Sequence, residues 1–267
     1  RDLGCPIFDR TSRGMVPTKR GEEFLRYAKA ILIQEEQIEA LCQQDTGRTL
    51  TVSLAAPRAS YISYGFASFM RQMTDYPTMK VDYRETNSRD IIRGVSGKTF
   101  DLGIVRFQSL YVPYYQKMLQ DENLESQDLW EFSCNLLMSA SHPLAERDDL
   151  TYLDLSDYVE LVQGDTKAPS FSFEPEDSPS VSGSSRKIIS IYDRGSQLEL
   201  LRQLPGAFMW TSPVPYDLLN SLALIQKPCT YPGNLHKDIL IYRSGYRMSR
   251  EEKELVNCLR RLVSQLS

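Results

Sequence analysis

The chain of 267 residues lacks the features that mark several other classes of protein. No apolar run approaches the roughly 20 residues that a membrane-spanning helix needs, and no signal peptide opens the sequence. The five cysteines are scattered without a CxxC pair, which favours reduced thiols over a disulfide framework. Two isolated histidines are too few to suggest a metal centre. We therefore predict a cytoplasmic protein that has no membrane contact, no metal and no cofactor.

Short motifs of the common enzyme classes are also missing. The sequence contains no GxSxG, GxGxxG, HExxH, GxxxxGKS or GxxxxGKT pattern. His142 belongs to a residue type that often acts as a catalytic base, but we interpret it as structural because the sequence offers it no reactive constellation. An enzyme is therefore not expected.

Charge is distributed unevenly along the chain, although the total is only −4. Residues 1–29 hold seven basic and four acidic side chains, and the remainder holds 24 basic and 31 acidic ones. The front end is thus net positive and the rest net negative. Such an arrangement is consistent with a polyanion-binding head on a body that does not itself bind DNA.

Residues 18–44 carry the pattern of one long helix. Thr18 is a suitable N-cap, and acidic residues occupy the first turn. Apolar or small residues recur close to every 3.5 positions, which is typical of a helix that pairs with another along a narrow seam. We favour pairing with a second copy of the chain, and burial against the chain's own domain is the alternative. The predicted seam residues are Phe24, Ala28, Ile31 and Ile38.

Alternating strand and helix patterns predict a parallel sheet in the first half of the chain. Strand patterns occupy 50–54, 79–83 and 101–105, and Ser60 and Ser88 are placed to cap the helices between them. Parallel strands need such crossover connections, which are right-handed. This region therefore forms a first α/β lobe.

A second region repeats this arrangement. Strand patterns lie at 129–139, 158–162, 187–192 and 207–210, and the stretch 166–185, rich in serine and proline, indicates a surface loop. Near its end the chain returns through a strand and a final amphipathic helix that starts with a capping box. A chain that crosses twice between two lobes predicts a cleft between them.

The strand ends supply the candidate ligand contacts, because ligands of such sheets bind beyond the carboxyl ends of the strands. A helix N-terminus at Ser60 favours an anion, and Arg58 and Arg106 lie at the same edge. A carboxylate-bearing small molecule is thus the preferred ligand. The alternative is that either arginine pairs with a local acid and faces water. The candidate contacts from both lobes are Arg58, Ser60, Thr86, Arg106, Gly164, Arg194 and Thr211.

A family resemblance joins these parts. The run Leu3-Gly4-Cys5-Pro6-Ile7-Phe8-Asp9-Arg10, with Arg13-Gly14, Thr18 and Gly21 after it, resembles LysR-type transcriptional regulators. The later His-Pro-Leu-Ala stretch from His142, which follows a strand, is a recurrent feature of their effector domain.

This resemblance implies the end of a recognition helix, a wing, and a linker helix that dimerises. Arg10 and Arg13 then lie on the wing near DNA phosphates or the minor groove, whereas without the resemblance they are solvated loop charges. Pro17 departs from the leucine usual in the family, and the first helices are absent. We therefore expect a fragment that does not bind a specific operator by itself.

The combined prediction is an α/β protein with a two-lobed, type-2 periplasmic-binding-protein-like effector domain. It senses a small effector and regulates transcription as a homodimer or homotetramer on DNA. The alternative function is a substrate-binding protein of a transport system with the same fold. The predicted domains are a winged helix-turn-helix remnant (1–17), a linker helix (18–46), a first lobe (47–128 with 233–267) and a second lobe (129–232).

Overall fold

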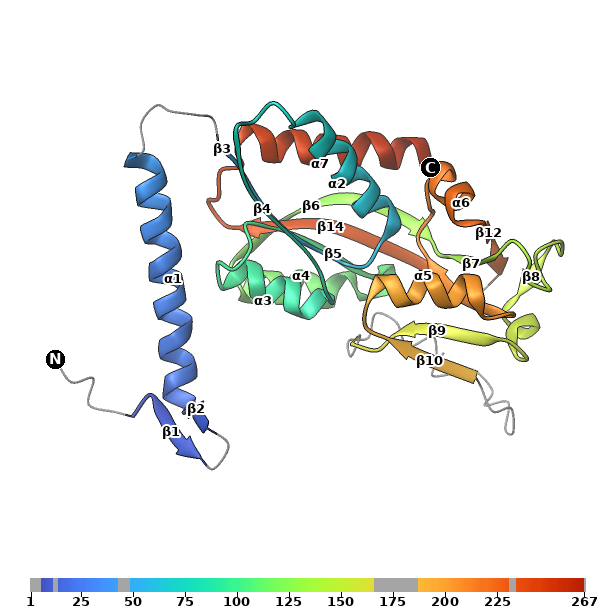
Figure 1. Ribbon diagram of the computed structural model, residues 1–267, viewed down its shortest axis with the longest axis horizontal. Helices are drawn as coiled ribbons and strands as arrows, with labels where there is room; N and C mark the ends of the chain where they lie inside the picture. Colours follow the sequence, from blue (N-terminus) through green and yellow to red (C-terminus); the bar gives the residue numbers. More distant parts are fainter. Residues whose placement is uncertain (1–5, 12–13, 43–48, 166–186, 231–233, 267) are drawn as a thin grey trace.

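The computed structural model describes residues 6–11, 14–42, 49–165, 187–230 and 234–266 (Figure 1). At its front, β1 (Phe8–Thr11) and β2 (Gly14–Pro17) form an antiparallel hairpin that leads into α1 (Lys19–Cys42). The predicted long helix is therefore confirmed. The Gly21 amide donates to the Thr18 hydroxyl oxygen at 2.9 Å, so the predicted N-cap is confirmed as well.

The segment before the hairpin is fixed to the start of α1. The Thr18 amide donates to the Ile7 carbonyl and its hydroxyl donates to the Pro6 carbonyl, both at 2.9 Å. A Cβ atom on Gly21 would collide with the Ile7 carbonyl oxygen. Glycine is therefore required where this segment approaches the first turn of the helix.

The first lobe is built on a five-stranded sheet. Strands β3, β4 and β5 are mutually parallel, as predicted, whereas β14 runs antiparallel to both of its neighbours. The order across the sheet is β4 (Thr78–Glu85), β3 (Thr49–Ala56), β5 (Leu102–Gln108), β14 (Leu235–Arg243) and β6 (Leu124–Ser133).

Helices cover both faces of this sheet (Figure 1). On one face lie α2 (Ser60–Gln72) and α7 (Arg250–Leu266), whose buried side chains join one apolar cluster with β3 and β6. On the other face, α3 (Ser88–Ser96) and α4 (Val112–Asp121), preceded by the short η1 (Ser109–Tyr111), form a second cluster. Burial of apolar area on both faces is the main stabilising contribution to such a layered domain.

The N-cap residues of the helices in the first lobe can be compared with the predicted ones. The predictions for Ser60 and Ser88 were wrong, because Ala59 and Asn87 are the N-cap residues and both serines begin their helices. Asn87 is the better cap for α3, since its side chain accepts from the Asp90 amide. The capping box of α7 is confirmed by bonds of 2.8 and 3.0 Å between Ser249 and Glu252.

The second lobe repeats the sheet order of the first. Strands β9, β10 and β11 are parallel, and β7 is antiparallel to β11 and β12. A small pair, β8 (Leu150–Thr151) with β13 (Cys229–Thr230), and the 3-10 turn η2 (Tyr152–Leu155) lie beside it. The order is β10 (Lys187–Ile191), β9 (Val159–Gln163), β11 (Ala207–Thr211), β7 (Asn135–Ser139) and β12 (Leu224–Lys227), with helices α5 (Arg194–Gln203) and α6 (Tyr216–Leu222).

The chain passes between the lobes at two adjacent points. The predicted single strand over 129–139 was wrong: β6 ends in the first sheet, β7 begins in the second, and Cys134 lies between them. The Cys134 amide donates to the Asn234 side-chain oxygen at 3.0 Å, and the Asn234 side-chain nitrogen donates to the Cys134 carbonyl at 2.7 Å. We call Cys134 and Asn234 the hinge pair.

Two predictions from the sequence have still to be compared with the structure. None of the helices in the described part of the chain has the length and apolar character needed to cross a membrane. The predicted loop over 166–185 lies outside the described residues.

Candidate functional site

Arg58 connects the first lobe to the second. It follows β3, and its guanidinium forms a bidentate ion pair with Asp165, which follows β9 of the other lobe. The Nη1–Oδ1 and Nη2–Oδ2 distances are 2.8 and 2.9 Å. The Arg58 side chain is only 8% exposed. Arg58 therefore pairs with an acid, as in the alternative given above, but that acid is 107 residues away in sequence and not local. The arginine side chain is also buried and does not face water.

Arg194 makes the reciprocal connection from the second lobe to the first. It begins α5 and pairs with Glu85, at the end of β4, through Nε–Oε2 and Nη2–Oε1 distances of 2.9 and 2.7 Å. Its Nη1 atom also donates to the Ser60 hydroxyl at 3.2 Å. We call Arg58–Asp165 and Arg194–Glu85 the two cross-lobe ion pairs. Bidentate arginine–carboxylate pairs combine a strong attraction with a fixed geometry.

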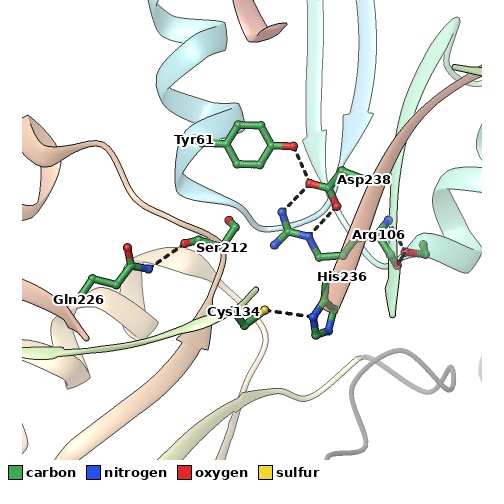
Figure 2. Close-up of polar contacts among 8 residues, drawn as sticks. Tyr61, Arg106, Cys134, Ser212, Gln226, His236 and Asp238 are labelled. Atoms are coloured by element: carbon green, nitrogen blue, oxygen red, sulfur yellow. Dashed lines mark hydrogen bonds and ion pairs between the residues drawn. The ribbon is translucent and has the colours of Figure 1, made fainter. Parts of the chain in front are cut away.

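Arg106 lies deeper in the first lobe, between its strands (Figure 2). It is 3% exposed and pairs with Asp238 of β14 through Nε–Oδ1 and Nη2–Oδ2 distances of 2.8 and 2.6 Å. The Tyr61 hydroxyl donates to the same carboxylate at 2.5 Å. Burial, followed by the Asp238 charge, raises the pKa of Tyr61, so the phenol keeps its proton and remains a donor. The cluster of Tyr61, Arg106 and Asp238 is therefore internally neutralised.

The second lobe presents two buried polar groups that were not among the predicted contacts. Ser212 follows β11, is 1% exposed, and faces the Arg106 guanidinium in Figure 2. Gln197, in the first turns of α5, is 4% exposed. Among the described residues, the Ser212 hydroxyl and the Gln197 side-chain nitrogen have no hydrogen-bond partner. Buried polar atoms without partners are rare and costly, which singles out these two positions in the second lobe.

Gln226 holds the Ser212 region in place. Its side-chain nitrogen donates to the Thr211 hydroxyl at 2.7 Å and to the Ser212 carbonyl at 2.9 Å, while its oxygen accepts from the Val214 amide at 3.0 Å. Figure 2 shows the bond to Ser212. The backbone beyond β11 is thus fixed, although the Ser212 hydroxyl is left without a partner among the described residues.

The hinge pair lies beside the same cluster, with His236 next to it. The His236 Nδ1 atom is 3.3 Å from the Cys134 sulfur and 3.0 Å from the Asn234 carbonyl oxygen. Burial raises the pKa of the Cys134 thiol to about 12. A thiol that stays protonated is a poor nucleophile and a poor redox centre. Cys134 and His236 therefore serve the geometry of the crossing.

The remaining predicted contacts use mainly their backbones. The Thr86 amide donates to the Ala56 carbonyl, and the Gly164 amide donates to the Ile191 carbonyl, both at 2.9 Å. A Cβ atom on Gly164 would lie 2.5 Å from the Tyr192 ring. The structure brings Arg58, Ser60, Arg194 and Thr211 to the facing edges of the lobes. The assignment of the seven residues as effector contacts stays a prediction.

Residues predicted to bind DNA or to dimerise lie in the front end. Arg10 is in β1, but its side chain and that of Ile38 lie outside the described part, as does all of Arg13. Phe24 and Ile31 are 40% and 64% exposed on α1, and Ala28 is half-buried. Their roles stay predictions.

Comparisons with known proteins agree on one family. Residues 43–167 match the family model described as LysR substrate binding domain. An uncharacterized HTH-type transcriptional regulator, YnfL of Escherichia coli, is 26% identical over 161 residues, which cover 58% of this chain and 50% of the relative. CbbR of Xanthobacter flavus is 30% identical over 108 residues, or 39% of this chain and 31% of CbbR. This chain thus spans half or less of these two curated relatives.

Solved structures share the fold at lower identity. HinK, a LysR family transcriptional regulator from Pseudomonas aeruginosa, superposes with a TM-score of 0.54 at 15% identity and covers 94% of this chain and 83% of HinK. The effector binding domain of QuiR in complex with shikimate gives 0.52 at 15% identity, covering 82% of this chain and 99% of that domain.

The fold and the facing strand ends define a two-lobed effector-binding domain of the type-2 periplasmic-binding-protein class, as predicted. With the match of residues 43–167 and the regulator relatives, the chain is similar to LysR-type transcriptional regulators.

Proposed function

We propose that the chain is the sensing part of a ligand-responsive transcription regulator, in which a small effector binds between the lobes and alters their relation. The observation that carries this proposal is the meeting of reciprocal strand-end arginines and carboxylates from two equivalent lobes, beside a hydrogen-bonded hinge pair. An effector can shift such an equilibrium only by its difference in affinity for the two arrangements, typically about 1–3 kcal/mol.

The effector contacts are proposed to come from both lobes. We add Ser212 and Gln197 to the predicted effector contacts. Both side chains are buried and have atoms without hydrogen-bond partners among the described residues, and a polar ligand would supply those partners. The arginines and the start of α2 favour a carboxylate on that ligand. The QuiR domain in complex with shikimate is a precedent for a small polar molecule on this fold. The proposed set is Arg58, Ser60, Thr86, Arg106, Gly164, Arg194, Gln197, Thr211 and Ser212.

The front end is proposed to serve DNA binding and assembly. The hairpin β1–β2 corresponds to the predicted wing, where Arg10 and Arg13 would meet DNA phosphates. Exposed apolar side chains on α1 support a seam with a second copy through Phe24, Ala28, Ile31 and Ile38. The complete regulator would be a homodimer or homotetramer, and its ligand would act through paired linker helices.

A transport protein and an enzyme are the competing functions for this fold. The hairpin and α1 favour the regulator, because a transport substrate-binding protein has no use for a basic hairpin on a dimerising helix. The proposal also includes a cytoplasmic location and no catalytic activity, in keeping with the family.

A thermal-shift screen tests the effector proposal. Benzoate, succinate and citrate are compared with benzamide, which is neutral. Binding to the native state at a hundred times Kd stabilises by about 2.7 kcal/mol, so at least one carboxylate should raise Tm clearly.

The substitutions Gln197→Ala and Ser212→Ala should reduce the rise in Tm, whereas Asp128→Asn, on the exposed edge of β6, should not. A panel without any shift in the wild-type chain would contradict a carboxylate effector.

A further inference from the structure

Every arginine predicted to receive the effector's carboxylate already holds a carboxylate of the chain. Arg58 pairs with Asp165, Arg106 with Asp238 and Arg194 with Glu85, each bidentately. An incoming carboxylate therefore meets no free guanidinium among these three. It must compete for one that is engaged.

The three pairs differ in what their release would do. Arg106–Asp238 lies within one sheet, and both side chains are almost fully buried. Breaking that pair would leave uncompensated charge in the core, which is strongly destabilising. The two cross-lobe ion pairs are partly exposed and join different lobes. Their release changes the contact between the lobes and leaves each core intact.

Asp165 is held less firmly than Glu85. Glu85 accepts from Arg194 and also from the Tyr83 hydroxyl at 3.1 Å. Asp165 has hydrogen bonds to Arg58 alone among the described residues. The neighbouring Asp193 is engaged elsewhere, because it caps α5 by accepting from the Ser196 amide at 2.8 Å. Asp165 is thus the carboxylate that a ligand can replace at the smallest cost.

We propose that the two cross-lobe ion pairs form a latch that sets the spacing of the lobes, and that an effector carboxylate acts by replacing Asp165 on Arg58. This deepens the proposed function and rests on it for the identity of the ligand. The exchange preserves the bidentate bond of Arg58 while removing one of the two ion pairs between the lobes. The lobes then move about the hinge pair at Cys134 and Asn234.

The distance between the lobes in the absence of ligand tests the latch directly. Nitroxide labels are attached through Ala67→Cys on α2 and Glu199→Cys on α5, both at exposed positions, in a background with Cys5→Ser and Cys42→Ser. The other three cysteines are buried and are retained. Distances between the labels are measured by double electron–electron resonance.

Asp165→Asn and Glu85→Gln should each shift the label distances to longer and broader distributions, and the double variant should shift them most. The matched control is Asp148→Asn, which removes the same charge from a pair with Lys227 inside the second lobe. An Asp165→Asn, Glu85→Gln distribution that equals the control would overturn the latch, whatever any ligand does.

Calorimetry with benzoate, succinate and citrate tests the exchange. Asp165→Asn should raise the affinity for the carboxylate that binds by about tenfold, within the usual range of such couplings. Arg58→Gln should abolish binding, and Asp148→Asn should leave it unchanged.

If the wild-type chain binds a carboxylate as tightly as the Asp165→Asn variant, or more tightly, the proposed exchange is wrong. The effector proposal is unaffected by that outcome. If no probe binds the wild-type chain or the Asp165→Asn variant, the proposals of a carboxylate effector and of the exchange are both wrong. The latch is then tested by the label distances alone.

Discussion

The two lobes have the same sheet order but differ in how their buried polar groups are satisfied by hydrogen bonds. In the first lobe, Tyr61, Arg106 and Asp238 satisfy one another within the core. In the second lobe, the Gln197 and Ser212 side chains keep atoms without partners among the described residues. The comparison indicates that the polar core of the first lobe is a self-contained scaffold, whereas the second lobe keeps buried polar atoms that the proposed ligand would satisfy.

Burial of the strands shows the same contrast. The strand β5 of the first lobe is buried along its whole length, and helices cover both sides of its sheet. The edge strands β4 and β10 are mostly exposed in both lobes, but in the second lobe β11, the counterpart of β5, is only half-buried at its end and β9 is mostly half-buried. A strand with less buried apolar surface opens at a lower free-energy cost. The second lobe is therefore the more adaptable partner.

Removing the buried charge of the scaffold is the strongest way to break this comparison. Asp238→Ala leaves Arg106 without its partner in a site where Asp238 is 0% exposed, so the free energy of unfolding should fall by about 3–5 kcal/mol. Asp128→Ala, which removes an exposed partner of Lys237 in the same lobe, should change it by about 0.5 kcal/mol at most. Urea unfolding measures both. Equal losses would show that the cluster does not support the first lobe.

Acid should weaken the second lobe through His142. The Leu144 amide donates to His142 Nδ1 at 3.0 Å, which requires a neutral ring with its proton on Nε2. Burial lowers the pKa of His142. As pH falls below about 6.5, the unfolded chain then binds more protons than the folded one, and stability is lost.

His142→Asn should make the loss of stability between about pH 7 and about pH 5.5 smaller. The measurement is the urea midpoint reported by Trp210 fluorescence, in a Trp130→Phe background that leaves only the tryptophan of β11. An unchanged pH dependence would exclude His142 as its source.

The smallest expected effect compares one buried serine of each lobe, which differ in whether the hydroxyl is hydrogen-bonded. The Ser88 hydroxyl, in the first lobe, donates to the Arg106 carbonyl at 2.8 Å and accepts from the Arg106 amide at 3.2 Å. Ser88→Ala should therefore cost about 1–2 kcal/mol. Ser212→Ala removes a hydroxyl that has no such bond in the described structure, so its effect should stay within about 0.5 kcal/mol. Chemical denaturation in parallel decides, and a larger loss for Ser212→Ala would reverse the assignment.

Local patterns predicted most of the fold because they depend on neighbours in the sequence. Apolar alternation gives the strands, and heptad-like spacing gives α1. The break at Cys134 escaped prediction because Leu129 and Leu136 continue one apolar pattern across it, and only the bonds to Asn234 divide the strand. Periodicity carries no information about such distant partners.

The site was harder to predict for the same reason. Its arginines were identified from strand ends, but their partners lie 107, 109 and 132 residues away in sequence. Ser60 was placed at a helix start and proved to accept a bond from Arg194 of the other lobe. Polar residues at strand ends signal that a site is near, whereas only the tertiary fold reveals which of them neutralise one another.

The hinge pair also has a use in protein engineering. Because Cys134 and Asn234 are hydrogen-bonded to each other, everything between them is a continuous insert whose two ends meet. Such an insert can be excised as a cassette and exchanged for that of a relative, without rethreading the surrounding chain. Chimeras made at this junction would exchange the second-lobe part of the proposed effector site while keeping the first lobe and α1 unchanged.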